Sequence, residues 1–460
     1  MTYALILAAG KGTRMKTEIP KCAYPILKKP MISYIVEKLE QTNNVDEIIC
    51  VVGYKKEVFY DLLQQKVTFA VQEQQLGTAN AVLSAKDVLK NKKGSTIIVP
   101  GDVPLMSVKL TDKIINTHNA AGNDLTAVTM IVDNPKGYGR ILRDDEGNIE
   151  RIVEDKDATY VEKQIREVNT GVYVVNNEYL FEVLKEVKSE NQKKEYYLTD
   201  IINLMYGKYK VGSFVVRDVQ QVMGVNDLYQ ISLAEKFLRE EINKNHMING
   251  VYMVNPETIT IGYDVSIEPG VTILPNTTIT GKSVIKTGTV VGPNTEIHES
   301  EIHENVTVKH SLIYDSTIME KSTVGPFAHL RENAIIGIAN RIGNFVEVKN
   351  SQTGHDTKAA HLSYIGDSSV GSRVNFGCGS ITVNYNGISK HKTNIGDDVF
   401  IGCNVNMIAP LNISNNVFIA AGSTVTKDIP EGSLAIARGK QVNKVDYYTH
   451  LIKPKPEKGE

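Results

Sequence analysis

The sequence predicts two domains of different architecture, an N-terminal α/β domain with a mostly parallel sheet and a C-terminal parallel β-helix, joined by a long helix. The chain has 460 residues, which is more than one typical domain contains. In its first half, short apolar runs alternate with helix-like segments. In its second half, aliphatic side chains recur at six-residue spacing in two runs: Ile261, Ile267, Ile273, Ile279, Ile285, Val291 and Ile297, then Ile395, Ile401, Met407, Ile413, Ile419 and Val425.

The N-terminal domain, assigned to residues 1–226, is predicted from strand-like apolar runs. These runs are Ala4–Leu7, Glu47–Val52, Thr96–Val99, Leu125–Val132 and Val172–Val175. Met31–Leu39 has helical periodicity and lies between the first two runs. Alternating strands and helices are typical of a Rossmann-like sheet covered by helices on both faces. Ligands of such sheets bind at the carboxyl ends of the strands, where Gly-rich turns follow in this sequence.

A linker helix is assigned to residues 227–248. The segment Asp227–Asn245 is rich in Leu, Ala, Glu and Lys and contains neither Gly nor Pro. These residue types favour a helix and lack its usual interruptions.

The C-terminal domain, assigned to residues 249–460, contains the six-residue repeat. Neither the helix period of 3.6 nor the strand period of 2 produces this spacing, whereas hexapeptide repeats are typical of a parallel β-helix. The repeat predicts roughly ten coils stacked about 4.8 Å apart. Its register breaks within 297–324, at 351–357 and at 384–392, where we expect protruding loops. The charged, Pro-containing tail begins near Gln441, and we expect its end to be disordered.

Composition excludes several classes of protein. A formal net charge of −2 argues against a nucleic-acid binder or a membrane-surface protein. No signal peptide or membrane-spanning run is evident. The four cysteines have no metal-ligand spacing, so we expect reduced thiols in a cytoplasmic protein.

The first candidate site is the turn Leu7–Met15, which reads LAAGKGTRM and follows the first predicted strand. Its glycines allow backbone N–H groups to approach an anion, and Lys11 and Arg14 add positive charge. Alone, such a turn is equally compatible with a plain strand-to-helix connection.

Three further motifs accompany this turn and the Pro20-Lys21 that follows it. They are Gln72 with Gln75–Ala79, Gly101–Leu105 and Gly137–Arg140. Together the four motifs resemble the sugar-nucleotide pyrophosphorylases, which join a sugar 1-phosphate to a nucleoside triphosphate. Catalysis between two polyanions depends mainly on charge neutralisation and in-line positioning.

The resemblance implies roles for individual residues. Arg14 and Lys21 are expected to act catalytically on the phosphates, and Asp102 and Asn226 to hold Mg²⁺. Asp102 alone could equally be a turn residue, and Asn226 could cap the linker helix, either instead or as well. UDP-N-acetylglucosamine is expected to contact Leu7, Ala8, Ala9, Gly10, Lys21, Gln72, Gly77, Thr78, Gly139, Glu154, Asn169 and Asn226.

A second candidate site lies in the repeat region, on 325–331, 343–349, 360–367 and 383–387. These segments resemble the bacterial bifunctional N-acetylglucosamine-1-phosphate uridylyltransferase/glucosamine-1-phosphate N-acetyltransferase family, and the resemblance runs from about Ala4 to about Lys444. It implies a left-handed β-helix and assigns His361 as the general base for acetyl transfer. It places the sugar phosphate on Arg331, Lys349, Tyr364 and Asn375, and acetyl-CoA on Cys378, Asn384, Tyr385, Cys403, Ala421 and Arg438.

Cys378 and Cys403 depart from the Ala or Ser that the family pattern allows. Their thiols fit the same space and raise the possibility of thiol sensitivity, although buried inert cysteines are the favoured interpretation. Lys390 and Lys392 could add charge near the CoA phosphates, or could lie in a solvated loop.

Two hypotheses follow for the whole chain. In the first, a bifunctional enzyme acetylates glucosamine 1-phosphate and then transfers uridylyl from UTP, supplying UDP-N-acetylglucosamine for peptidoglycan and other envelope polysaccharides. The family resemblance implies a homotrimer with small-molecule substrates. In the alternative, the β-helix is only an assembly or regulatory module on a single-activity pyrophosphorylase.

Overall fold

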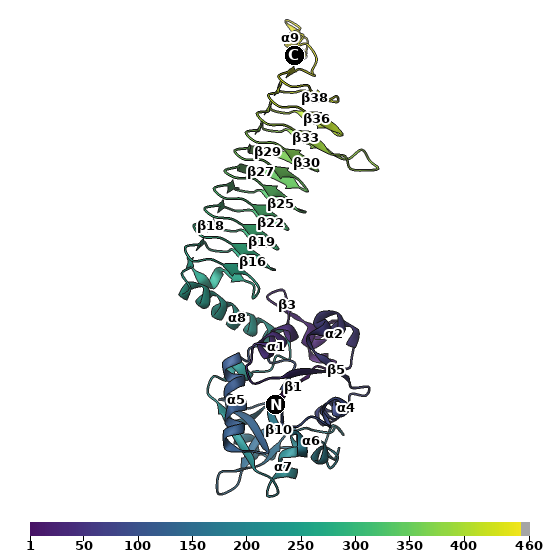
Figure 1. Cartoon of the computed structure of the whole chain (residues 1–460), viewed down its shortest axis with the longest axis vertical. Coiled ribbons are helices and arrows are strands. Elements are labelled where there is room, and N and C mark those ends of the chain that lie inside the picture. Colours follow the sequence, from purple (N-terminus) through teal and green to yellow (C-terminus); the bar gives the residue numbers. More distant parts are fainter. Residues whose placement is uncertain (452–460) are drawn as a thin grey trace, which may run out of the picture. The chain divides into compact units, whose positions relative to one another are not determined.

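The structure is a computed structural model that describes residues 1–451 and divides into two compact units, Met1–Glu241 and Ile242–Glu460 (Figure 1). Each unit has its own hydrophobic core, as two separately packed domains do. The end of the predicted disordered tail lies outside the described residues.

The sheet of the first unit has the strand order β11-β7-β10-β6-β1-β4-β5, with β8 and β9 attached beside β10. Strand β10 runs antiparallel to β6 and β7, whereas β1 is parallel to β4 and β6. The predicted mostly parallel sheet is therefore confirmed. The strands are β1 (Thr2–Leu7), β4 (Glu47–Val52), β5 (Thr68–Val71), β6 (Ser95–Pro100), β7 (Leu125–Ile131), β8 (Arg140–Arg143), β9 (Ile149–Val153), β10 (Glu167–Asn176) and β11 (Val211–Val216), with a separate hairpin of β2 (Pro25–Ile26) and β3 (Lys29–Pro30).

Both faces of this sheet are buried because successive side chains of a strand point to opposite sides. Tyr3 and Leu5 pack into one hydrophobic cluster, and Ala4 and Ile6 into the other. The helices are α1 (Met31–Glu40), α2 (Lys56–Leu63), α3 (Thr78–Ser84), α4 (Lys86–Leu89), α5 (Val108–Ala121), α6 (Asn177–Leu184) and α7 (Asp200–Met205), with 3₁₀ turns at Thr13–Met15, Lys21–Ala23, Gln64–Lys66, Glu162–Gln164 and Val219–Val222.

Helix α8 (Leu228–Ile248) occupies the predicted linker segment. It begins after Asp227, whose carboxylate accepts a hydrogen bond from the Gln230 backbone N–H at 2.8 Å, as an N-cap does. Near its other end, the buried Asn243 amide donates to the carbonyls of Pro256 and Ile259, at 2.8 and 2.9 Å. The last turns of α8 therefore belong structurally to the second unit.

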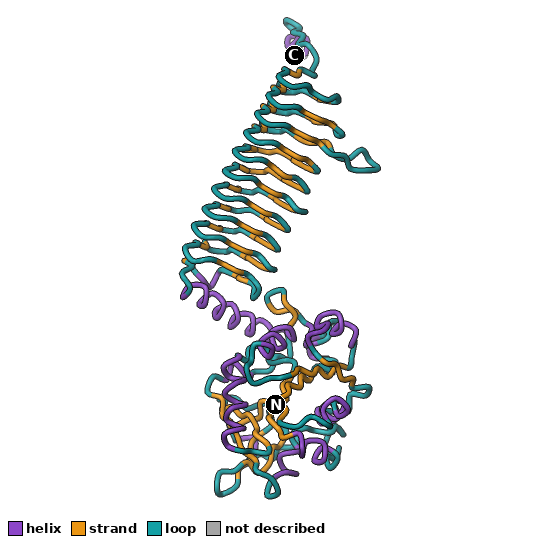
Figure 2. The backbone as a smooth tube through the Cα atoms, in the orientation of Figure 1, coloured by secondary structure: helices purple, strands orange, loops and turns teal. Residues whose placement is uncertain are grey.

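The second unit is a left-handed parallel β-helix whose coils alternate short strands with turns (Figure 2). One face is a ladder of nine strands. The other two faces form one continuous 19-stranded sheet because β27 and β29 run through the corner between them. The first face consists of β14 (Ser266–Ile267), β17 (Val284–Ile285), β20 (Glu301–Ile302), β23 (Thr317–Ile318), β26 (Ile335–Ile336), β28 (Gln352–Thr353), β30 (Ser368–Val370), β33 (Thr393–Ile395) and β36 (Leu411–Ile413).

We call the other two faces face A and face B. Face A consists of β12 (Tyr252–Met253), β15 (Thr272–Ile273), β18 (Val290–Val291), β21 (Thr307–Val308), β24 (Thr323–Val324), the starts of β27 (Arg341–Lys349) and β29 (Lys358–Gly366), β31 (Asn375–Phe376), β34 (Phe400–Ile401), β37 (Phe418–Ile419) and β39 (Leu434–Ala435). Face B consists of β13 (Thr260–Ile261), β16 (Thr278–Thr280), β19 (Glu296–His298), β22 (Leu312–Tyr314), β25 (His329–Arg331), the ends of β27 and β29, β32 (Ile381–Val383), β35 (Asn406–Ile408) and β38 (Thr424–Val425). A 3₁₀ turn (Pro256–Thr258) and α9 (Tyr447–Leu451) complete the described elements.

The aliphatic side chains at six-residue spacing point into the β-helix and form one core. Ile279, Ile297 and Ile401 are fully buried within it. The predicted hexapeptide fold is thus confirmed side chain by side chain.

Two of the three expected protruding loops are instead shortened coils. An ordinary coil of three hexapeptides takes the chain from Ser266 to its partner Val284. The next two steps, from Val284 to Glu301 and from Glu301 to Thr317, each fall short of that length, as does the step from Ile335 to Gln352. A shortened corner shifts the six-residue count while the strands stay in register, so the prediction of loops at 297–324 and 351–357 was wrong.

The third break is a real insertion. The step from Ser369 to its partner Asn394 is well beyond the length of an ordinary coil, and the extra residues form a loop with a bridge between Tyr385 and Lys390. This loop extends from the stack near β33 (Figure 1).

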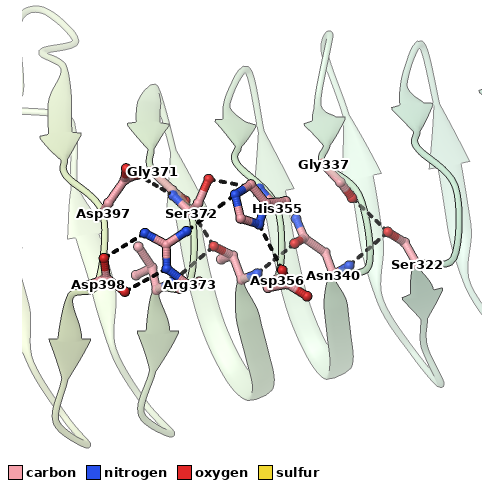
Figure 3. Close-up of polar contacts among 12 residues, drawn as sticks. Ser322, Gly337, Asn340, His355, Asp356, Gly371, Ser372, Arg373, Asp397 and Asp398 are labelled. Carbon is pink, nitrogen blue, oxygen red and sulfur yellow. Dashed lines mark hydrogen bonds and ion pairs between the residues drawn. The ribbon is translucent and has the colours of Figure 1, made fainter.

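One corner of the β-helix is held by polar contacts between successive coils (Figure 3). Arg373 lies between the Asp398 carboxylate, at 2.7 Å, and the His355 ring, at 3.3 Å. Deeper in the corner, the buried Asn340 amide donates to the Thr353 hydroxyl and accepts from the Thr357 N–H. The backbone groups left over at a turn are thereby satisfied.

Among residues 1–451, no helix is long and apolar enough to cross a membrane.

Candidate active sites

A cavity of about 950 Å³ opens at the carboxyl ends of β1 and β6 in the first unit. Twelve of the sequence-predicted residues line it: Leu7, Ala9, Gly10, Arg14, Lys21, Gln72, Gly77, Thr78, Asp102, Glu154, Asn169 and Asn226. They come from separate strands and turns, which the parallel topology brings to one edge of the sheet.

Two predicted residues do not line this cavity. Ala8 is buried in the hydrophobic cluster on the opposite face of the sheet, and its N–H donates to the Val51 carbonyl. Gly139 lies just behind the wall, where its carbonyl accepts from the Asn169 N–H at 2.9 Å. A Cβ at Gly139 would come within 2.9 Å of the Ile152 side chain and 3.5 Å of a Glu154 carboxylate oxygen.

The Gly-rich turn brings Lys21 into the site. Gly12 has a φ of +64°, and a Cβ there would come within 2.4 Å of the Lys21 Cβ. Glycine is therefore required both by the backbone conformation and by this close approach. Lys11 is instead exposed, with its ammonium 5.2 Å from the centre of the Tyr54 ring.

Two cationic side chains converge on the residues proposed to hold the metal ion. Lys21 forms an ion pair with Asp102, and its Nζ donates to the Asn226 Oδ1 at 2.7 Å. Arg14 donates to the same oxygen at 2.6 Å. The Asn226 side chain is engaged here, and Asp227 caps α8, so the alternative that Asn226 caps the helix was wrong.

Asp102 and Asn226 fit a hard divalent cation. A side-chain oxygen of each residue accepts a hydrogen bond from the Lys21 ammonium. The two oxygens therefore already stabilise a positive charge at one position. No cluster of three or more His, Cys, Asp or Glu side chains suited to a metal occurs within residues 1–451. Two oxygen ligands suffice for Mg²⁺, which usually keeps several waters and binds substrate phosphates.

Acidic and aromatic side chains gather at another part of the cavity wall. Burial raises the pKa of Glu154, and the nearby Asp157 and Asp200 carboxylates raise it further, against the opposing charge of Lys193. The cavity is also lined by three residues that were not predicted from the sequence: Lys193, Glu195 and Tyr197. They lie in a polar connection without a motif, so no sequence signal marked them.

The second candidate site follows the corner between faces A and B. Register pairing places Asn344, His361, Cys378, Cys403 and Ala421 in one column, with one residue from each coil. We call this set the corner column. The side chains of the first two meet, since the Asn344 Oδ1 lies 2.9 Å from the His361 Nδ1. An amide oxygen there accepts from Nδ1–H, which leaves the His361 Nε2 lone pair free to take a proton.

Cationic and acidic side chains lie beside this column on face B. Arg331 and Lys349 are register partners. Arg331 pairs with Glu347 at 2.6 Å, and Lys349 pairs with Glu332 at 3.1 Å. Both cations were predicted from the sequence, but neither carboxylate was. In the sequence, Glu332 and Glu347 look like ordinary surface glutamates.

The inserted loop adds a third cation. The neighbouring Lys349 ammonium lowers the pKa of Lys390. Lys390 therefore lies with the residues predicted to bind the sugar phosphate rather than in an isolated solvated loop.

The same loop positions Asn384. Its amide donates to the Asp367 carboxylate and, at 3.3 Å, to the Tyr364 hydroxyl. Tyr385 is exposed, and its hydroxyl donates to the Gly387 carbonyl. Asp367 was not assigned a role from the sequence, although it ends the predicted 360–367 motif.

Asn375 lies apart from the other predicted sugar-phosphate residues. It pairs with Lys358 and Phe400 on face A, whereas Arg331, Lys349 and Tyr364 lie on face B. Within one chain, the structure does not bring these four residues together.

The predicted acetyl-CoA residues continue along the corner column. Cys378 and Cys403 are exposed, so the favoured interpretation of buried cysteines was wrong. Beyond them, Arg438 donates to the Ala421 carbonyl at 2.8 Å. A Cβ at Gly402 would meet the Ala421 N at 2.5 Å, so the coils approach too closely here for larger side chains.

The first unit matches the family model described as nucleotidyl transferase over residues 3–236. This range contains every predicted residue of the first site.

Relatives match along the entire chain. The Bifunctional protein GlmU of Acholeplasma laidlawii is 61% identical over 458 residues, which cover 100% of this chain and 99% of the relative. Proteins of the same name from an Exiguobacterium species and a Geobacillus species are each 45% identical and cover 97% and 98% of this chain, and 99% and 98% of their own. The chain therefore belongs to the family of bifunctional GlmU proteins.

Proposed function

We propose that this protein makes UDP-N-acetylglucosamine in two steps at two separate sites. The β-helix transfers acetyl from acetyl-CoA to glucosamine 1-phosphate. The nucleotidyl transferase unit then transfers uridylyl from UTP to N-acetylglucosamine 1-phosphate and releases pyrophosphate. One observation supports this proposal most directly: each unit has its own set of converging polar side chains. The chain is also related over its full length to bifunctional proteins.

In the uridylyl transfer, the chain's own groups hold and neutralise phosphate. Backbone N–H groups of the Gly-rich turn bind phosphate oxygens, and Arg14 and Lys21 offset the charge that develops there. Asp102 and Asn226 would hold Mg²⁺, which supplies further charge neutralisation when bound. Lys21, which pairs with Asp102 and Asn226 in the free protein, would contact the phosphates if a metal ion took these two oxygens.

In the acetyl transfer, His361 removes a proton from the attacking amine through Nε2. Asn344 holds the ring through Nδ1 and fixes this tautomer. Arg331, Lys349 and Lys390 bind the sugar phosphate, and the small residues of the corner column leave a groove for the pantetheine arm of acetyl-CoA.

We assign uridylyl transfer to residues 1–226, the linker to 227–248 and acetyl transfer to 249–460. The substrates of both reactions are small, and we place the protein in the cytoplasm.

We further propose a homotrimer in which the acetyl site is shared. Asn375 lies on face A, whereas the sugar-phosphate cations lie on face B of the same chain. Packing face A of one copy against face B of the next reunites the predicted set, and such head-to-tail contacts close into a ring.

Two single variants test the division of labour. His361→Ala should abolish acetyl transfer and spare uridylyl transfer, and Asp102→Ala should do the reverse. Acetyl-CoA consumption with glucosamine 1-phosphate and pyrophosphate release from UTP measure the two reactions separately. His355→Ala is the matched control, since this exposed histidine lies on another corner of the same β-helix.

Persistence of acetylation in His361→Ala would refute the role of His361 as the base. Absence of acetylation in the wild-type protein would favour the alternative in which the β-helix is only an assembly module. A joint loss of both activities in either variant would refute two independent sites.

Shared sites are tested by mixing two inactive variants. His361→Ala and Asn375→Ala, denatured and refolded together, should regain acetyl transfer, because about a quarter of randomly assembled interfaces receive both intact residues. Light scattering should report three copies. A fully active monomer, or no recovery on mixing, would exclude the shared site.

A further inference from the structure

Two exposed cysteines lie on consecutive coils of the β-helix. Phe376 pairs with Ile401, and Ile381 pairs with Asn406, so the register is the same on both sides of the corner. Cys378 therefore lies directly opposite Cys403. Both thiols are free and exposed, unlike Cys22 and Cys50, which are buried in the first unit.

The spacing of the coils suits a disulfide. Neighbouring parallel strands lie about 4.8 Å apart, and Cα atoms joined by a disulfide lie roughly 4.4–6.8 Å apart. The flanking glycines keep the coils close, since a Cβ at Gly377 would come within 2.5 Å of the Cys403 N. Gly377 and Gly402, which directly precede the two cysteines, carry no side chain that could separate them.

The same column places the pair beside the proposed base. His361 precedes Cys378 by one coil. Ala359 pairs with Phe376 and Tyr364 pairs with Ile381, so the register is the same on both sides of these two residues. Any change at Cys378 therefore occurs one coil from the position where the acetyl group would react.

We propose that Cys378 and Cys403 form a redox-active dithiol that a low-molecular-weight disulfide converts into an intramolecular disulfide, closing the acetyltransferase site reversibly. The thiolate of one cysteine attacks a sulfur of the small disulfide and releases one thiol. The other cysteine then displaces the second small thiol, so the sulfur–sulfur bond forms between the two coils and the oxidant leaves as two thiols. Such reversible disulfides in the cytoplasm are typically redox-sensing.

The effect on acetyl transfer rests on the proposed function of the groove. In the disulfide the two sulfur atoms are about 2.05 Å apart, so both side chains leave their separate positions. The bridge then lies along the path of the pantetheine arm. The nucleotidyl transferase unit has no part in this change.

The experiment treats the full-length protein with glutathione disulfide and follows intact mass, peptide mapping and both activities. We expect a mass lower by two hydrogen atoms, one peptide pair joined through Cys378 and Cys403, loss of acetyl transfer and retained uridylyl transfer. Dithiothreitol should restore acetyl transfer. Cys22 and Cys50 should stay unmodified as internal controls, because both are buried.

Single variants separate a dithiol from two independent thiols. Cys378→Ser and Cys403→Ser should each stop at a mixed disulfide that carries one glutathionyl group. Two mixed disulfides on the wild-type protein, or no modification, would overturn the proposal. If the untreated protein lacks acetyl transfer, the proposed function fails, while the mass measurement still decides whether the dithiol forms.

Discussion

At the residue scale, Glu154 illustrates how a side chain proposed to bind substrate can destabilise the free protein. Burial is the main cause that raises its pKa, so the folded state resists ionising it. The sign follows from proton linkage. Protonated Glu154 stabilises the folded state. This stabilisation is fully present below the pKa of a glutamate in the unfolded chain, and it is lost as the pH rises through the higher pKa of the folded state. At neutral pH, Glu154 therefore favours unfolding.

We accordingly expect Glu154→Gln to melt at a higher temperature than the wild type at pH 8, with the difference shrinking toward pH 4. Uridylyl transfer should fall, because the side chain lines the cavity proposed to bind the nucleotide. Thermal unfolding of the ligand-free protein across this pH range measures the effect. Glu186→Gln, at an exposed glutamate, should show no such trend, and an equal stabilisation at both pH values would contradict the explanation.

Residues in contiguous motifs could be predicted, whereas their ionic partners could not. Lys21, Asp102 and Asn226 meet in the structure as their motifs suggested. Glu332, Glu347 and Lys193 entered no prediction, because a charged residue outside a motif resembles the solvated surface until a fold brings it beside a partner.

At the element scale, the inward aliphatic column supports each coil. Ile318→Ala removes a fully buried side chain from the core of the β-helix and leaves a cavity between its coils. We expect a loss of about 2–5 kcal/mol in the free energy of unfolding. Thr317→Ala changes the adjacent outward residue of the same strand and should cost less than about 0.5 kcal/mol. Denaturant unfolding compares the two, and similar losses would contradict the inward-column account.

The six-residue spacing of the buried aliphatic residues also explains which part of the β-helix could not be predicted from the sequence. A break in a six-residue count looks alike whether residues are added or removed. Only the pairing of strands shows which kind of break is present. The coil between Glu301 and Thr317 is shortened, whereas the coil between Ser369 and Asn394 is lengthened. The fold class was therefore predictable, but two of the three breaks were misread.

At the scale of the whole molecule, the two units should function separately. The first unit contains two hydrophobic clusters of its own, and its cavity is lined by residues up to Asn226. We expect a protein ending after Ile248, which keeps α8 whole, to retain uridylyl transfer and to lack acetyl transfer. Pyrophosphate release per mole of protein, compared with the full chain, measures this. A loss of more than about tenfold, or about 1.4 kcal/mol, would show that the first unit depends on the second.

The inserted loop after Asn384 has an evolutionary consequence. Because the enlarged coil returns to register with the ordinary coil that follows, the loop is an appendage that leaves the hydrophobic stack unchanged. Its length and charge can vary without refolding the solenoid, although it carries Lys390 to the proposed sugar-phosphate site beside Lys349. Selection can therefore retune what this site accepts by editing one hairpin, while the stacked coils stay as they are.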